Sequence, residues 1–306
     1  MKNKIIQGDS LQVLKQIEDD SIHAIVSDIP YGISYDEWDV LHENNNSALG
    51  GSSKAQKKHG KVFKRRGKPL NGWSKADRKI PQEYQNWCES WATDWLRVLK
   101  PGASCFVFAG RRYASRAIIA LENAGFTFKD MIAWEKSTAP HRAQRISLVY
   151  DRRGDKLNSK EWEGWRLGNL RPLYEPILWF QKPYKTGTTL TDNVKKYGVG
   201  AWNENIFSKY STSTEDVKIN SNIIQVKSLP TDRGLHDAQK PLNLMKFLID
   251  LVTKENQLVL DPFAGSGTTC LAAQELNRFY IGIEKNPEYV DISKKRLNEK
   301  QLKLNI

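Results

Sequence analysis

Two acidic residues end apolar stretches that lie far apart in the chain. Asp28 follows the run from His23 to Ser27 and precedes Ile29, Pro30 and Tyr31. A carboxylate only accepts hydrogen bonds, and a tyrosine ring stacks on flat ligands. The stretch "SDIPYGIS" therefore predicts a strand end that presents an acceptor and an aromatic ring to a ligand. On its own it is also typical of a plain turn, in which Asp28 caps the backbone and Pro30 sets φ.

The second acid, Asp261, opens the glycine-rich stretch "DPFAGSGTT" after the apolar run "LVL". Gly265 and Gly267 allow close approach of the backbone to a ligand, and the helix expected to follow offers unpaired N–H groups. About 20 residues further on, "YIGIEKN" ends an apolar run in Glu284, the type and spacing of an acid that accepts a ribose hydroxyl. A ligand with a nucleoside part is indicated.

Three ligands compete for this loop. A phosphate loop would need a lysine after the last glycine, and none follows Gly267. A dinucleotide site would need a third glycine after G-x-G-x-x, and the chain has none at that spacing from Gly265 and Gly267. An adenosyl ligand with a sulfonium, S-adenosylmethionine, fits carboxylates at Asp28 and Asp261, and the π face of Phe263 is expected to face the positive sulfur.

Taken together, the two stretches carry a family resemblance. Asp28-Ile29-Pro30-Tyr31 resembles the [DNS]-P-P-[YF] signature of amino-group methyltransferases, and "DPFAGSG" matches the D-P-F-x-G-x-G signature of their cofactor loop. With the catalytic signature first, the chain resembles the permuted beta group of DNA amino-methyltransferases, the adenine-N6 or cytosine-N4 family. It departs twice, with Ile29 at a usual proline and Asp237 at the proline of the H-P-x-Q-K-P segment.

The resemblance implies a Rossmann-like S-adenosylmethionine-dependent α/β fold, a mostly parallel sheet with helices on both faces, plus inserted loops. Strands that alternate with helical patterns point the same way. It implies that Asp28, Ile29, Pro30 and Tyr31 are catalytic, and no metal site is expected. The implied cofactor-binding residues are Asp9, Asp28, His236, Gln239, Lys240, Asp261, Pro262, Phe263, Ala264, Gly265, Ser266, Gly267, Thr268, Thr269 and Glu284.

The expected chemistry is direct methyl transfer to an exocyclic amine. The carboxylate of Asp28 and the carbonyl of Ile29 or Pro30 hold the two N–H groups of the amine, while Tyr31 stacks on a base swung out of the duplex. Both signatures must then meet at neighbouring strand ends. An aspartate in the first signature position favours adenine-N6, with cytosine-N4 as the alternative. An RNA or protein amino-methyltransferase and an inactive DNA-binding protein are the other classes.

Charge indicates a polyanionic partner. Among 306 residues there are 47 Lys and Arg against 35 Asp and Glu, a net charge of +12. The stretch from 44 to 75 is basic without an acid, which is typical of a solvated loop and also of a phosphate-binding one. Double-stranded DNA is the expected partner, and the expected DNA-binding residues are Lys57, Lys58, Lys61, Lys64, Arg65, Arg66, Arg142 and Arg145.

The expected organisation is one methyltransferase domain in three parts. Residues 1–183 form the catalytic part with a basic insertion at about 40–80, residues 184–235 a target-recognition insertion outside the sheet, and residues 236–306 the cofactor-binding part. Three scattered cysteines fit a reducing, cytoplasmic setting, and no segment is apolar enough for a membrane. A restriction endonuclease or a second copy of the chain is a further expected partner.

Overall fold

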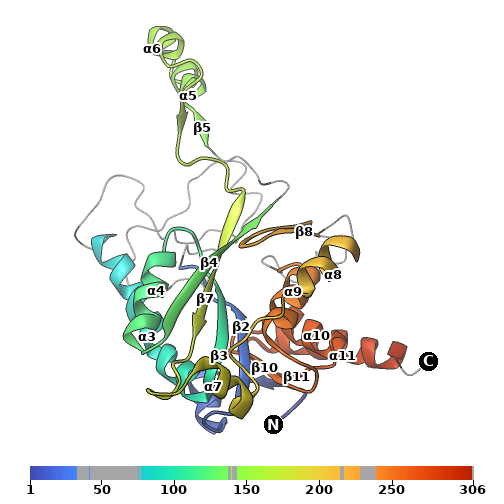
Figure 1. The fold of residues 1–306 in the computed structure, drawn as a ribbon. Coiled ribbons are helices and arrows are strands. Elements are labelled where there is room, and N and C mark those ends of the chain that lie inside the picture. Colours follow the sequence, from blue (N-terminus) through green and yellow to red (C-terminus); the bar gives the residue numbers. More distant parts are fainter. Residues whose placement is uncertain are drawn as a thin grey trace.

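A single large sheet organises the molecule (Figure 1). The computed structural model describes residues 1–32, 41, 75, 77–136, 139, 143–213, 217–227 and 239–304. These residues form a 9-stranded sheet of order β1-β11-β10-β2-β3-β7-β4-β9-β8 and a 2-stranded sheet, β5-β6. The strands are β1 (Lys4–Gln7), β2 (Ile22–Asp28), β3 (Leu99–Phe108), β4 (Thr127–Glu135), β5 (Gln144–Arg145), β6 (Arg166–Leu167), β7 (Tyr174–Gln181), β8 (Val217–Asn220), β9 (Ile223–Val226), β10 (Leu258–Asp261) and β11 (Phe279–Glu284).

Helices connect and cover these strands. The α-helices are α1 (Ser10–Val13), α3 (Ile80–Val98), α4 (Ala114–Asn123), α5 (Ile146–Arg152), α6 (Lys156–Glu161), α7 (Leu190–Tyr197), α8 (Ile206–Ser213), α9 (Leu242–Val252), α10 (Thr268–Glu275) and α11 (Pro287–Leu304). Two short 3-10 helices are η1 (Leu14–Gln16) and η3 (Asp77–Lys79).

Strand direction gathers the functional ends at one edge. The five strands β1, β11, β10, β2 and β3 pair in parallel, whereas β7 runs antiparallel between β3 and β4. The last residues of β2, β10 and β11 and the first residues of β7 therefore share one edge, here called the carboxyl edge. The predicted mostly parallel sheet is confirmed.

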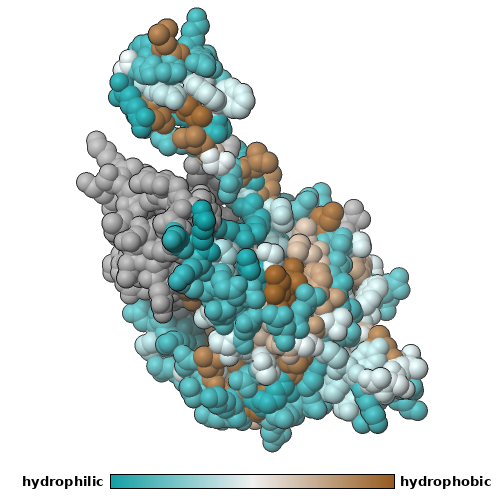
Figure 2. All heavy atoms as spheres, turned by 90° about the vertical axis from the view of Figure 1, so that its left-hand side faces the viewer, coloured by the Kyte–Doolittle hydropathy of each residue, from teal (hydrophilic) through white to brown (hydrophobic). Residues whose placement is uncertain are grey.

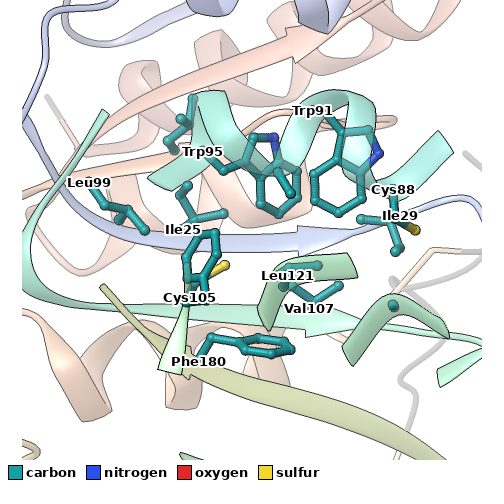
Figure 3. Packing of buried hydrophobic residues seen from close by; sticks show 14 of the residues in the cluster. Ile25, Ile29, Cys88, Trp91, Trp95, Leu99, Cys105, Val107, Leu121 and Phe180 are labelled. Atoms are coloured by element: carbon teal, nitrogen blue, oxygen red, sulfur yellow. The ribbon is translucent and has the colours of Figure 1, made fainter. Parts of the chain in front are cut away.

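Two apolar layers cover the sheet, one on each face. Side chains alternate along β2, so Ile25 joins the cluster under α3 and α4 while Ala24 and Val26 join the cluster under α9 and α10. On the first face Trp91 and Trp95 of α3 lie over the sheet (Figure 3). The free cysteines divide between the layers, with Cys88 and Cys105 in the first and Cys270 in the second. Helices on both faces were predicted and are found.

Two strands within residues 184–235, β8 and β9, belong to the sheet, so the prediction that this segment stands outside the sheet is wrong. Strand β9 pairs in parallel with β4, from Ala133 opposite Ile223 to Glu135 opposite Gln225, and β8 extends the same edge. Helix α7 packs beside β3, where Asn193 Nδ2 donates to the carbonyl of Pro101 at 2.9 Å. Strands of four residues carry too little periodicity to be told from loops in the sequence.

Pro101 and Gly102 lie inside β3, although a Pro-Gly pair is typical of a turn. The pairing with β2 shifts register between Ile22 and Ala24, and this irregularity accommodates the proline. Gly102 has a φ of +83°, which favours glycine.

Several predicted residues lie outside the described part of the chain: Lys57, Lys58, Lys61, Lys64, Arg65, Arg66, Arg142 and His236, with most of the basic insertion at about 40–80. The described segment that leaves the body is instead residues 143–173, here called the arm, which joins β4 to β7 (Figure 1). Of the described helices, none combines the length and apolar character that a bilayer crossing needs.

Candidate active site

The two signature stretches lie side by side, as predicted. Strands β2 and β10 are parallel neighbours, with Ala24 opposite Val259 and Ile25 opposite Leu260. Just beyond this register the Ser27 hydroxyl donates to Asp261 Oδ1 at 2.7 Å. The Asp28 turn and the glycine loop therefore emerge from adjacent strands at the carboxyl edge.

Asp28 uses one carboxylate oxygen and leaves the other without a partner. The ammonium of Lys240 donates to Asp28 Oδ2 at 2.5 Å. Oδ1 is buried and accepts no hydrogen bond from the residues that the structure describes. Burial raises the pKa of Asp28, and the charge and hydrogen bond of Lys240 offset part of that rise. Asp28 thus keeps an acceptor atom available.

Glu175 anchors the groups around Asp28. Its Oε2 accepts from the Tyr31 hydroxyl at 3.1 Å and lies 3.8 Å from the Lys240 ammonium, while Lys136 pairs with Oε1. Burial alone would raise the pKa of Glu175, but the charges of Lys240 and Lys136 and the hydrogen bonds hold it below its usual value. The same burial, with both carboxylates nearby, raises the pKa of Tyr31 well above its ordinary value, so the phenol stays protonated.

The turn that follows Asp28 is held from α3 and from the residues after β3. The Tyr84 hydroxyl donates to the carbonyl of Pro30 at 3.1 Å. Ile29 is buried at 2% exposure in the cluster under α3, where an aliphatic side chain replaces the usual proline (Figure 3). At the end of β3, a Cβ added to Gly110 would lie 2.9 Å from Tyr31 Cβ, so glycine leaves the space that the tyrosine occupies.

The glycine loop is fixed by β11 and α11. The Gly265 N–H donates to Glu284 Oε2 at 2.8 Å, and the Ser293 hydroxyl donates to the Gly265 carbonyl at 2.8 Å. Gly267 has a φ of +77°, and a Cβ there would lie 2.9 Å from Ser293 Cβ. Close packing of the loop against α11 therefore requires this glycine.

Phe263 and Asp261 have internal partners that the sequence did not predict. The Phe263 ring packs among the α3 tryptophans, with its centroid 5.7 Å from that of Trp87. Asp261 Oδ1 accepts from Ser27 and, at 3.1 Å, from the Phe263 N–H. Burial raises the pKa of Asp261 to about 6. These contacts set the shape of the loop.

Buried polar atoms without partners test whether S-adenosylmethionine fits. Besides Asp28 Oδ1, such atoms among the described residues include Ser10 Oγ, both amide atoms of Gln239 and Thr269 Oγ1, all on segments that border the carboxyl edge. Buried polar groups are nearly always paired, so this set is typical of a ligand site. The amino, carboxylate and hydroxyl groups of S-adenosylmethionine match such a mixed set of donors and acceptors.

Of the other predicted residues, Asp9 lies near the site and Arg145 lies far from it. Asp9 lies beside the end of β11, where its Oδ2 is 3.2 Å from the Lys285 ammonium. Arg145 lies in β5 of the arm, exposed and away from Asp28. Sequence reasoning missed Tyr84, Gly110 and Ser293, because each acts on residues far away in sequence and no spacing rule links them.

Comparison with known proteins names the family. The family model described as DNA methylase, N6_N4_Mtase, matches residues 22–295. The chain belongs to the N6/N4 DNA methylase family. It is 63% identical to the Type II methyltransferase M.HindIII of Haemophilus influenzae, over 96% of this chain and 94% of that protein. M.HinfI of the same species, also a Type II methyltransferase, is 26% identical over 97% of this chain and 68% of its own length.

Two solved structures share the fold. The PvuII DNA methyltransferase (cytosine-N4-specific) superposes with a TM-score of 0.60 at 19% identity, over 97% of this chain and 86% of that chain. The complex of M1.HpyAVI with S-adenosylmethionine gives a TM-score of 0.54 at 22% identity, over 96% and 98%. The predicted family and fold are confirmed, and the protein is a DNA methyltransferase. The M1.HpyAVI structure holds the cofactor predicted here, S-adenosylmethionine.

Proposed function

We propose that the protein methylates the exocyclic N6 of adenine at a specific site in double-stranded DNA. The observation that carries the proposal is the buried Oδ1 of Asp28, which has no hydrogen-bond partner among the described residues and lies at a strand end that adjoins the glycine loop. An aspartate in the first position of the signature supports adenine over cytosine. Cytosine-N4 is the alternative that the test must separate.

Residues of the catalytic turn hold the target amine. Its lone pair is delocalised into the ring, so the amine needs two acceptors that draw its N–H groups out of the base plane. Asp28 Oδ1 is one acceptor, and the carbonyl of Ile29 or Pro30 is the other. Tyr84 fixes the direction of the Pro30 carbonyl, and Tyr31 supplies a face for the base. When bound, S-adenosylmethionine supplies the electrophilic methyl group.

The activity test is transfer of labelled methyl from S-adenosylmethionine to unmethylated duplex DNA, with RNA and protein as control substrates. Digestion to nucleosides then separates the two products. Label in N6-methyladenine is the expected result. Label in N4-methylcytosine would overturn the choice of base, and label only in RNA or protein would overturn the proposal.

Asp28→Asn tests the role of the carboxylate. Its amide nitrogen donates where the carboxylate accepts, so methyl transfer is expected to fall by about 100-fold or more. The affinity for S-adenosylmethionine, measured by calorimetry, is expected to change by less than about threefold, because the proposal assigns Asp28 to the amine and not to the cofactor, to which the resemblance also assigned it. A variant that transfers methyl normally would contradict this assignment.

The relatives' designation as Type II methyltransferases supports a place in restriction-modification. Modification then protects host DNA from an endonuclease that reads the same site. Sequencing modified bases in DNA from a host that expresses the protein, with the Asp28→Asn variant as control, should reveal one methylated motif. Methylation without a common motif would contradict site-specific action.

A further inference from the structure

The arm begins and ends at the carboxyl edge. Strand β4 enters it at Glu135 and β7 leaves it at Tyr174, and these two residues pair with each other. Since β4 is antiparallel to β7 and β7 is antiparallel to β3, β4 ends on the same side as β2, which ends in Asp28. The arm therefore projects from the edge that carries the catalytic turn (Figure 1).

The arm contributes little to the core. Within residues 143–173 only Ser159 is buried. Helices α5 and α6 pack on each other, and the rings of Trp162 and Trp165 meet edge to face with centroids 5.5 Å apart. Figure 2 shows this unit as a knob that stands off the body. Ordering a segment costs conformational entropy, and this segment does not offset that cost by packing into the core. Such a segment is typical of a binding element.

Basic side chains dominate the arm. Arg145 and Arg166 lie directly opposite each other on the β5–β6 ladder. Two like charges in this arrangement repel each other and destabilise the strand pair. Arg166 donates to the Ala143 carbonyl at 3.1 Å, and neither guanidinium pairs with an acid in the described part of the chain. The arm's basic residues are Arg145, Arg152, Arg153, Lys156, Lys160, Arg166 and Arg171.

The four acids of the arm do not neutralise this charge. Asp155 caps α6 by accepting from the Asn158 N–H at 3.1 Å, and Asp151 lies 3.4 Å from Lys156. The other two are Glu161 and Glu163. The surplus of positive charge thus stays exposed on an arm that starts and ends at the carboxyl edge.

We propose that the arm grips the DNA duplex beside the extruded base, with Arg145 and Arg166 on backbone phosphates. Because it takes duplex DNA as the substrate, this proposal rests on the proposed function. Charge complementarity and the shared edge favour DNA over a second copy of the chain. Leu157 and Leu170, 87% and 88% exposed, are the features that a second copy would use, and the test includes that outcome.

The test compares two double variants that each remove two positive charges. Arg145→Gln/Arg166→Gln alters the arm, whereas Lys195→Gln/Lys196→Gln alters α7, which packs near Pro101 at the opposite end of β3. Fluorescence anisotropy measures the affinity for unmethylated duplex DNA between 50 and 200 mM salt. The arm variant is expected to bind about tenfold more weakly at 100 mM salt. The salt slope, which is the slope of log K against the logarithm of the salt concentration, should become shallower by about 2, since each lost phosphate contact contributes about 0.9. The α7 variant should match the wild type within about twofold.

A truncation gives a second, independent result. Replacing residues 146–165 with Asn-Gly closes the β5–β6 ladder with a two-residue hairpin turn. Affinity for S-adenosylmethionine reports that the site has folded, and DNA affinity is expected to fall further than in the double variant.

Three results would overturn the proposal: equal salt slopes in the two double variants, wild-type DNA affinity after truncation, or loss of self-association on truncation with an unchanged DNA slope. The last would assign the arm to a second copy. A wild type that binds DNA but transfers no methyl would instead refute the proposed function and leave the arm's binding role measurable.

Discussion

The protonation state of Asp28, the carboxylate that we propose holds the target amine, depends on the charge of one lysine. Lys240 has a side chain only 6% exposed and lies between Asp28 and Glu175. Two carboxylates buried side by side would hold a proton between them, and a protonated Asp28 donates where the amine needs an acceptor. Lys240 opposes this protonation and engages only Oδ2, so Oδ1 can receive the amine.

Lys240→Gln should therefore shift the pH dependence of methyl transfer. In the proposed reaction, transfer needs ionised Asp28 and is lost as pH falls through the folded pKa of that group. Removing the ammonium takes away a charge that lowers this pKa, so the acid limb of kcat/KM should move to higher pH. The matched control is Lys246→Gln on α9, which removes the salt-bridge partner of Glu275 on α10. This variant should leave the acid limb of kcat/KM where it is in the wild type. An acid limb unmoved in Lys240→Gln would rule out this role.

At the scale of the elements, β2 and β3 set the position of the Tyr31 ring. Gly110 follows β3 and lies against Tyr31, where a Cβ would come within 2.9 Å. Tyr31 is also tied to Glu175 at the start of β7. A shift of the Tyr31 ring would therefore disturb its packing against Gly110 or its hydrogen bond to Glu175.

Gly110→Ala is expected to displace Tyr31 and lower kcat by about tenfold or more, since a shift of about 1 Å at a positioning group can cost about 100-fold. Affinity for S-adenosylmethionine should be unchanged, because the glycine loop lies on β10 and α10. Unaltered kcat would show that the tyrosine can yield without loss.

Sequence reasoning succeeded at these elements where a local pattern carried the information. The acid-ended strands, the glycine loop and Glu284 were placed correctly because each lies in a short stretch with its own hydrogen-bonding requirement. The pairing of β9 with β4 and the fold of the arm were missed. Val217–Asn220 and Ile223–Val226 are too short for a periodic signal, and the arm buries almost nothing, so no apolar pattern marks its helices. Lys240 was placed at the cofactor, and its pairing with Asp28 joins positions that no spacing rule relates.

Over the whole molecule, one hydrogen bond joins the two halves of the site across most of the chain. Ser27 and Asp261 are 234 positions apart, and Asp261 is buried at 3% exposure. Its pKa, about 6 when folded, lies above the ordinary 3.8. The folded protein thus binds this proton more tightly than the unfolded chain does. The stabilisation is full below about pH 3.8 and is lost as pH rises through about 6.

Asp261→Asn removes this titration. The wild-type free energy of unfolding, minus that of the variant, should therefore decrease by up to about 3 kcal/mol between pH 4 and pH 7.5. Urea denaturation at the two pH values measures both proteins. A difference that stays constant with pH would show that the carboxyl titrates alike in both states.

The three buried cysteines can report when each side of the fold opens. Burial raises the pKa of the thiols of Cys88, Cys105 and Cys270, so an alkylating reagent finds a thiolate only when a layer separates from the sheet. Cys88 and Cys105 report on the α3–α4 side and Cys270 on the α9–α10 side. Peptide-resolved alkylation rates thus tell whether the two sides open together or one before the other.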